Sequence, residues 1–327
     1  VEDNEMLDEV VVVGYGVQKK SDVTGAMIRV GSEELNSRPV ANAFEAMQGK
    51  AAGVDIVSNE RPGEVATINV RGVRSLSASN TPLYVVDGIP LMSNSGIETL
   101  NPQDIESIDV LKDASATAIY GSRGANGVIL VTTKSGKEGK MSLNYSGTVT
   151  IENLQDYSEM MNSAEYIDWR RWSYYYLNPS KYPRGDQPTK ENDYEIFLGA
   201  TDPTAWKNIE KGWAGGTWDG SRVPNTDWCD MVTQTGVTHE HTLSASGGTD
   251  KMKGYASIGY LDNEGTVKGQ SYTRYTTKLS LDLKPTKWFN LGLNVNGTFS
   301  EQQYGSSASS VGQLIKGMPS NLYAAST

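Results

Sequence analysis

The sequence has little cysteine, little histidine and no long apolar run, and these absences exclude several kinds of bond, site and membrane segment. Among 327 residues there are one cysteine, Cys229, and two histidines, which excludes an intramolecular disulfide and a Cys-rich metal or redox motif. No stretch of about 18 apolar residues occurs, so a helical membrane span is excluded. Basic residues are outnumbered, 29 Lys and Arg against 39 Asp and Glu, and nucleic acid is therefore not expected as the main ligand.

The first residues also lack a secretion signal. Residues 1–8 are acidic and contain no basic segment followed by an apolar core, so we expect that a leader has been removed or that the start is missing. Apolar residues make up 37% of the chain and are mixed among polar ones throughout, which indicates a folded chain.

The part of the chain up to about residue 138 is rich in Val, Ile, Gly and Asp. Residues 41–48 and 113–120 have helical character, and each segment is closely followed by a glycine, Gly49 or Gly121. Short apolar runs bounded by turn residues predict strands at 10–13, 54–57, 66–70, 83–86 and 128–133. This region is therefore predicted to be a small α+β domain.

From Met141 onward the sequence alternates between apolar and polar residues over long stretches. The alternation predicts antiparallel strands at 141–151, 238–247, 252–261, 272–283 and 288–299. Tight turns are expected at 247–251 and 284–287, whereas the other connections are longer, above all 153–236. Short turns at one end and long loops at the other are typical of outer-membrane barrels. Five strands cannot close such a barrel, so the remaining strands must come from missing sequence or from another chain.

Three motifs carry a resemblance to a known family. Residues 69–72 (NVRG), 82–90 (PLYVVDGIP) and 101–134 closely resemble the plug domain of SusC-like TonB-dependent outer-membrane transporters. The resemblance implies an α+β plug followed by antiparallel strands of a 22-stranded plugged barrel. It divides the chain into an N-terminal segment (1–13), a plug (14–138) and the first barrel strands and loops (139–327).

The same resemblance implies a function and a set of partners. We expect TonB-dependent import of an oligosaccharide or a peptide across the outer membrane of a Gram-negative bacterium, with the plug and the N-terminus facing the periplasm. The implied partners are a SusD-like surface lipoprotein that acts as a lid, the TonB energy-transducing complex, and outer-membrane lipid. No enzymatic reaction, cofactor or metal site is expected.

Two other classes of protein remain as alternatives. One is a soluble or surface glycan-binding β-protein, which would not need an outward apolar face on its strands. The other is a carbohydrate-active enzyme that uses paired carboxylates such as Glu165 and Asp168.

Candidate site residues fall into four groups, and each group also has a plain structural interpretation. A TonB-binding box, which could instead be the first strand of the plug, comprises Leu7, Asp8, Glu9, Val10, Val11, Val12 and Val13. Plug loops that should face the substrate, or that are polar only because they face solvent, contain Asn59, Glu60, Arg61, Arg74, Ser75, Asn80, Ser93 and Asn94.

The third group is a latch between plug and barrel. The resemblance suggests that Arg71 and Arg123 pair with barrel carboxylates; the alternative is ordinary exposed arginines. The fourth group lies in the segment 153–236, which holds 14 of the 28 aromatic residues of the chain. Lid or ligand contact is predicted for Trp169, Trp172, Trp213 and Trp218. Aromatic residues could equally form a small core within the long loop.

Overall fold

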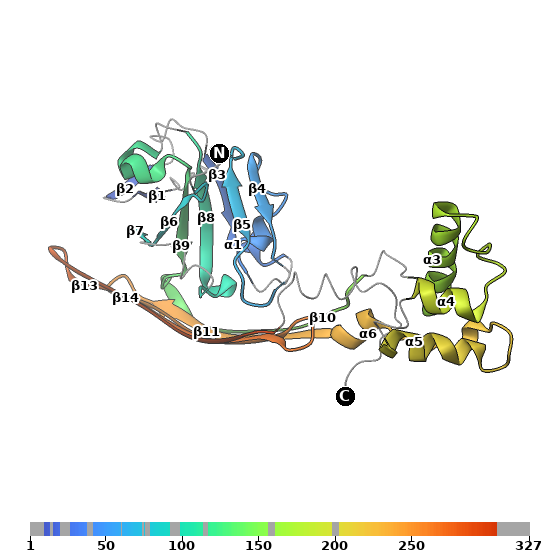
Figure 1. The fold of residues 1–327 in the computed structure, drawn as a ribbon. Coiled ribbons are helices and arrows are strands. Elements are labelled where there is room, and N and C mark those ends of the chain that lie inside the picture. Colours follow the sequence, from blue (N-terminus) through green and yellow to red (C-terminus); the bar gives the residue numbers. More distant parts are fainter. Residues whose placement is uncertain are drawn as a thin grey trace, which may run out of the picture. The chain divides into compact units, whose positions relative to one another are not determined.

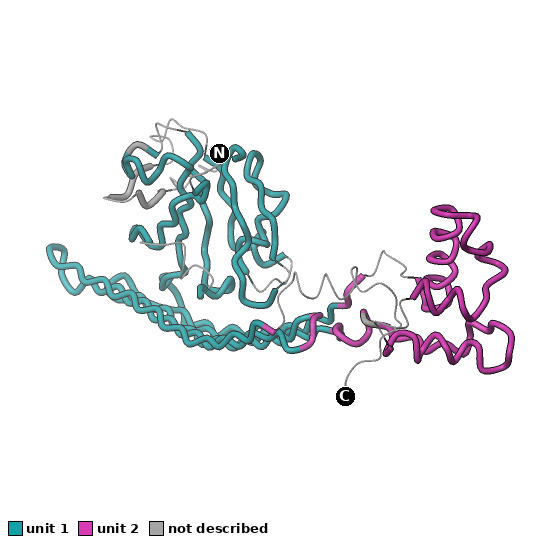
Figure 2. The backbone as a smooth tube through the Cα atoms, viewed as in Figure 1, with its two compact units in different colours: residues 1–152, 236–265, 269–304 teal, residues 153–235, 266–268, 305–327 magenta. Residues whose placement is uncertain are grey.

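The computed structural model describes residues 10–13, 16–19, 27–37, 42–59, 61–73, 75, 79–91, 99–113, 117–155, 161–197 and 203–305. They fall into two compact units, one made of residues 1–152, 236–265 and 269–304, and the other of 153–235, 266–268 and 305–327 (Figure 2). Within the described ranges, no helix is both long enough and apolar enough to cross a membrane.

The first unit contains a five-stranded mixed sheet, which we call the plug sheet. Its strand order is β3 (Met27–Gly31), β8 (Ile105–Leu111), β9 (Val128–Thr133), β6 (Leu83–Val86) and β7 (Ile89–Pro90) (Figure 1). β6 and β9 are parallel, and the other pairs are antiparallel. Two separate hairpins are formed by β1 (Val10–Val13) with β2 (Gly16–Lys19) and by β4 (Val54–Val57) with β5 (Thr67–Val70).

The plug has its own apolar core. β8 and β9 are buried along almost their whole length, and Ile108 and Ile129 pack in one cluster with Phe44, Met47 and Ile68. Among the described plug residues, helical structure includes α1 (Ser32–Leu35), Thr117 and short 3-10 turns at Glu45–Met47, Pro102–Asp104 and Ala118–Gly124. The segments expected to have helical character at 41–48 and 113–120 do so in their described parts: 45–47 and 118–120 are 3-10 turns, and the N–H of Thr117 donates to the Asp113 carbonyl at 3.0 Å, as in an α-helix.

The first unit also contains a second sheet, which we call the wall. It is a meander of β10 (Gly139–Glu152), β11 (Gly236–Gly248), β12 (Met252–Glu264), β13 (Gln270–Thr286) and β14 (Phe289–Tyr304). Each strand pairs antiparallel with the next, as the alternation in the sequence predicted. The turn expected at 284–287 lies further along, because β13 continues past a register shift between Leu283 and Thr286.

The second unit is helical. It contains α3 (Ser163–Leu177), α4 (Lys190–Ile196), α5 (Pro203–Glu210), α6 (Trp228–Val232) and 3-10 turns at Lys211–Trp213 and Gly220–Arg222. α3 begins at a capping box in which Asn162 and Glu165 satisfy each other's backbone N–H groups. The apolar cluster of the helical unit is formed by Ile167, Tyr182, Ile196, Phe197, Ile209 and Val223. The segment expected as one long loop is thus a small helical unit with its own core.

Candidate functional site

The two faces of the wall differ in polarity. One face carries buried polar side chains, among them Thr242, Lys278 and Ser280, and of these Thr242 and Lys278 form hydrogen bonds with the plug. The opposite face is apolar and exposed, with Leu143, Tyr145, Val149, Ile258, Leu279, Leu291, Leu293, Val295 and Phe299. A continuous exposed apolar face on antiparallel strands is what the lipid-facing side of a membrane barrel requires.

The dimensions of the apolar face match a membrane. On β14, Phe289 and Phe299 are ten residues apart, which is about 34 Å along a strand. At a strand tilt of about 45° this distance corresponds to roughly 24 Å of membrane depth, close to the apolar band of about 25 Å in outer-membrane barrels. Aromatic rings lie at both ends: Trp288 beside Phe289, and Tyr275 with its ring centroid 6.4 Å from that of Phe299.

The face of the wall that meets the plug makes hydrogen bonds with it. Asn101 donates to the Thr242 hydroxyl at 3.0 Å, and the Tyr255 hydroxyl donates to Asp104 at 2.8 Å. Near the other end of the wall, the Gln302 amide donates to the carbonyl of Pro62 at 2.7 Å. In the described part of this unit, the buried apolar clusters contain plug residues alone. Hydrogen bonds therefore join plug and wall, and the wall also buries the side chains of Tyr255, Leu261 and Tyr272.

The most connected of these contacts centres on Asp87, in the two-residue turn between β6 and β7. Asp87 has φ +47° and Gly88 has φ +83°, the conformation of a tight Asp-Gly hairpin turn. One carboxylate oxygen of Asp87 accepts the backbone N–H of Thr133 at 2.8 Å, and the other accepts the Thr133 hydroxyl at 2.6 Å. That second oxygen also accepts the side-chain amide of Asn294, on β14, at 2.7 Å.

Lys278, on β13, meets the same carboxylate from the wall. Its side chain is 2% exposed, and its ammonium group lies 4.0 Å from the Asp87 carboxylate. The ammonium donates to the Thr133 hydroxyl at 2.5 Å and to the side-chain oxygens of Asn294 and Asn296, each at 3.2 Å. A plug carboxylate that is 21% exposed and a buried wall ammonium therefore form a polar contact, which we call the Asp87–Lys278 contact.

The two arginines expected to latch the plug bond within the plug in the described structure. Arg71, with φ +60°, pairs with the carboxylate of Asp113 and is 46% exposed. Arg123 donates to the backbone carbonyl of Leu91. Burial and the nearby Arg71 charge both lower the pKa of Lys112, with burial the larger cause. Pairing of either arginine with a carboxylate in the rest of a barrel stays a prediction.

The predicted substrate-facing loops are described in part. Arg61 forms an ion pair with Glu64 at 2.7 Å and lies over the ring of Tyr304, on the wall, at 5.9 Å. A cavity of about 480 Å³ lies between this loop and the wall, lined by Gly63, Glu64, Val65, Tyr272, Ser300, Gln302 and Tyr304. Gly63 has φ +78°, and a Cβ at this position would lie 2.4 Å from the Tyr272 ring, so the close approach of loop and wall requires glycine.

Of the other predicted loop residues, the three that the structure describes, Asn59, Ser75 and Asn80, do not line this cavity. The side chain of Asn80 bonds both the N–H and the carbonyl of Ser75, at 2.9 and 2.7 Å, and so closes its own loop. Asn59 is exposed at the end of the segment after β4. Glu60, Arg74, Ser93 and Asn94 lie outside the described residues.

The predicted TonB-binding box is also only partly described. Its residues Val10–Val13 form β1, which pairs with β2 in a sheet separate from the plug sheet. Leu7, Asp8 and Glu9 lie outside the described residues. Both interpretations of this segment therefore stay open, since a two-stranded hairpin has an edge to which another strand can add.

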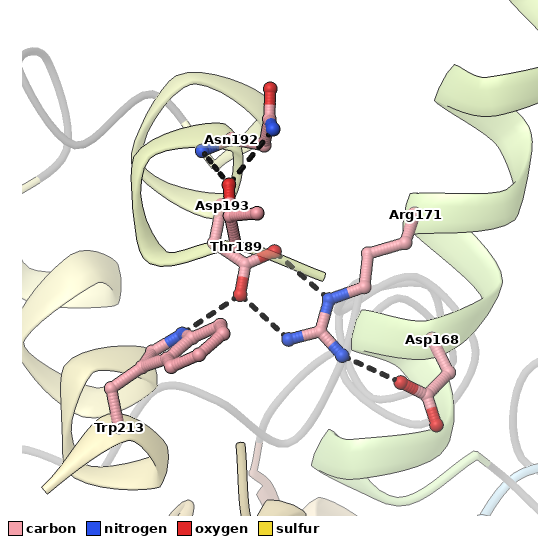
Figure 3. Close-up of polar contacts among 6 residues, drawn as sticks. All are labelled: Asp168, Arg171, Thr189, Asn192, Asp193 and Trp213. Carbon is pink, nitrogen blue, oxygen red and sulfur yellow. Dashed lines mark hydrogen bonds and ion pairs between the residues drawn. The ribbon is translucent and has the colours of Figure 1, made fainter. Parts of the chain in front are cut away.

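The four tryptophans expected to contact a lid or ligand have different surroundings. The indole N–H of Trp213 donates to Asp193 at 2.9 Å, and Asp193 also accepts two hydrogen bonds from Arg171, at 2.9 and 2.6 Å (Figure 3). The Arg171 guanidinium lies 3.9 Å from the centre of the Trp218 ring. Trp213 and Trp218 thus belong to the internal structure of the helical unit.

The remaining two tryptophans are on the surface of α3. Trp169 is 53% exposed, and Trp172 is half-buried, with the Arg184 guanidinium 5.7 Å from its ring centre. The two carboxylates considered for catalysis already have structural partners: Glu165 caps α3, and Asp168 pairs with Arg171 at 2.8 Å.

Sequence reasoning missed Asp87 and Lys278. The Asp-Gly pair between two apolar runs is a strong signal for a tight hairpin, and it could have placed Asp87 at a turn. Lys278 stands on the polar face of a strand whose other face is apolar, and a lysine in such a strand needs a partner in the lumen.

An α+β plug packed against antiparallel strands with an apolar outer face defines a plugged outer-membrane barrel, of which the described part is open. Residues 19–128 match the TonB-dependent receptor plug domain. The chain belongs to the SusC-like family of TonB-dependent receptors.

The similar proteins are much longer than this chain. SusC, a TonB-dependent receptor of Bacteroides thetaiotaomicron, is 35% identical over 332 residues, which cover 96% of this chain and 28% of SusC. The TonB-dependent receptor P39 of Formosa agariphila is 38% identical, over 90% of this chain and 25% of its own length. The RagAB peptide importer in its open-open state matches with a TM-score of 0.72 and 30% identity, over 91% of this chain and 33% of that chain. These relatives are receptors and transporters and are not enzymes.

Proposed function

We propose that the whole protein imports a large nutrient across the outer membrane with energy supplied through TonB. The observation that carries this proposal is a folded plug held by polar contacts against the inner face of a sheet whose outer face is apolar. A plug of this kind closes a lumen and can be displaced without opening its own apolar core. The family of the chain supports the same activity.

The orientation follows from the connections of the wall. The plug enters β10 at Gly139, which pairs with Gly248 at the end of β11 next to a tight turn. Tight turns in outer-membrane barrels lie on the periplasmic side and long connections lie outside. We therefore infer that the plug and the N-terminus face the periplasm and that the helical unit, inserted after Glu152, is extracellular.

A SusD-like surface lipoprotein is the proposed partner at the extracellular end. Trp169, Tyr176 and Leu177, all on α3, are exposed by 53%, 74% and 78%. Exposed aromatic and aliphatic side chains on a folded unit are suited to anchor a protein partner or to stack on a ligand. We assign lid or ligand contact to this surface of α3.

The proposed substrate class is an oligosaccharide or a peptide. RagAB is named as a peptide importer, whereas SusC is named only as a TonB-dependent receptor. The cavity beside Gly63 offers hydroxyl, amide and ring surfaces that suit either ligand. The ion pair of Arg61 with Glu64 leaves the cavity close to neutral.

The test is removal of the predicted TonB-binding box from the full-length protein. Deletion of residues 7–13 should abolish uptake of the nutrient on which growth depends, because the energy-transducing partner loses its strand-addition site. Surface exposure and binding of the lid should be unchanged, since the plug sheet does not include β1. Val11→Pro should have the same effect, because proline removes a backbone donor needed for pairing. Normal uptake by both variants would refute the proposal.

A further inference from the structure

In the Asp87–Lys278 contact, each charged group also has hydrogen-bond partners on its own side of the interface between plug and wall. Asp87 is held by the N–H and the hydroxyl of Thr133, both in the plug. Lys278 is held by the side-chain oxygens of Asn294 and Asn296, both in the wall. If plug and wall separate, each charged group therefore keeps two hydrogen bonds on its own side.

Three interactions cross between plug and wall at this point. They are the hydrogen bond from Lys278 to the Thr133 hydroxyl at 2.5 Å, the hydrogen bond from Asn294 to Asp87 at 2.7 Å, and the ion pair at 4.0 Å. Breaking a buried ion pair is usually costly because it leaves a charge with no compensation. Here both charges stay hydrogen-bonded, and water can replace the three crossing interactions.

The buried pair in the helical unit shows the contrast. Asp193 is fully buried, and its carboxylate accepts hydrogen bonds from Arg171 and Trp213, so separation from Arg171 leaves it with the single indole N–H. Separation of Arg171 from Asp193 is therefore unfavourable. At Asp87 the turn geometry and the bonds to Thr133 fix the carboxylate in the plug, so it is already oriented for docking again.

We propose that the Asp87–Lys278 contact is a reversible docking site between plug and wall, which opens when the plug is displaced and re-forms when it returns. The inference rests on the proposed import function. It assigns roles to Asp87, Thr133, Lys278, Asn294 and Asn296 that differ from a permanent structural ion pair.

The test uses the full-length protein in cells, with Cys229→Ser and a reporter cysteine at Ser280→Cys. Ser280 is 7% exposed and lies two residues after Lys278 on the same face of β13, so the reporter is shielded while the plug is docked. The probe is a water-soluble maleimide admitted to the periplasm. Labelling should be slow without TonB and at least ten times faster in energised cells that contain TonB.

Variants of the pair should open the contact without TonB. Asp87→Asn or Lys278→Met should each raise the labelling rate ten- to a hundredfold, and the double variant should raise it by less than the product of the two. Asp113→Asn is the matched control, because it breaks an ion pair within the plug and should leave the rate unchanged. If the reporter variant does not reach the outer membrane, hydrogen exchange of amides 83–90 can be measured in purified full-length protein. The exchange rates of the charge variants are then compared with that of Asp113→Asn.

If Asp87→Asn and Lys278→Met leave the labelling rate unchanged, the contact has no docking role. A rate that does not respond to TonB in energised cells would overturn the opening step. Failure of the import function has a different signature, because it is measured by uptake after deletion of residues 7–13. The effect of the charge variants in cells without TonB does not depend on that result.

Discussion

The buried Arg171–Asp193 pair gives the sharpest prediction for the helical unit. Their side chains are 2% and 0% exposed, and two hydrogen bonds at 2.9 and 2.6 Å join them. Asp193→Ala removes the carboxylate and leaves the Arg171 guanidinium buried. Loss of one partner from such a pair costs about 3 to 5 kcal/mol.

The structure places Asp193→Ala at the lower end of that range. Arg171 keeps its bond to Asp168 at 2.8 Å and its position over the Trp218 ring, which compensate part of its charge. We expect a loss of about 3 kcal/mol, which is roughly a 150-fold increase in local opening. The double variant Asp193→Leu with Arg171→Met should recover much of the loss, because apolar residues of similar size carry no desolvation penalty.

The assay is hydrogen exchange of the amides of α3 and α4 in full-length protein in detergent. Asp186→Ala is the matched control, since it removes a carboxylate from an ion pair whose side chains are about half exposed. Its effect should stay below about 1 kcal/mol. Equal changes in exchange for Asp193→Ala and Asp186→Ala would show that the buried pair does not stabilise the unit.

Two further predictions concern the loop at the wall and the surface of α3. Gly63→Ala should displace the loop, because the new Cβ would lie 2.4 Å from the ring of Tyr272. Gly72 has a similar positive φ, but no atom lies within 4 Å of a Cβ at that position, so Gly72→Ala should show only the backbone strain. Hydrogen exchange of amides 61–65 should therefore rise in the first variant far more than exchange near residue 72 does in the second. Trp169→Ala should weaken lid or ligand binding by about 2 kcal/mol, roughly 30-fold, with unchanged protein stability. Unaltered affinity in a binding titration would remove Trp169 from the recognition surface.

The strands of the wall were predictable because each has one buried and one exposed face. Leu279, Leu281 and Leu283 alternate with Lys278, Ser280 and Asp282, and this period of two is visible in the sequence alone. The family motif located the plug in the same way. Strand β8 was missed because both its faces are buried, so Ile105–Leu111 has no simple alternation.

The helical unit was missed for a different reason. Its helices are rich in aromatic and polar residues, and α3 carries no clear apolar stripe in Tyr166, Trp169, Trp172 and Tyr176. The capping box formed by Asn162 and Glu165 was the available local signal for the start of α3. The partners of Arg171 could not be predicted, because Asp193 and Trp213 reach it from later segments of the chain.

The two residues of the Asp87–Lys278 contact could each be singled out from the sequence, but their pairing could not. The Asp-Gly turn and the lone lysine on a polar strand face are both visible in the sequence. Their meeting depends on how the plug sheet packs against the wall, across 191 positions of the chain. The resemblance to the family directed attention to the arginines instead, and in the described structure those arginines bond within the plug.

The polarity of this interface affects how easily the plug can move. Exposing a buried Leu or Val side chain to water costs about 1.5 to 3 kcal/mol, whereas exchanging one hydrogen bond for water costs about 0.5 to 1.5 kcal/mol. The apolar residues of the plug, such as Ile108 and Ile129, pack among themselves and stay buried when the plug leaves the wall. The neutral Asn101–Thr242 and Gln302–Pro62 hydrogen bonds are therefore exchanged for water at a lower free energy per side chain than a leucine would require, whereas hydrogen bonds to the charged Asp87 and Lys278 cost about 1.5 to 3 kcal/mol each.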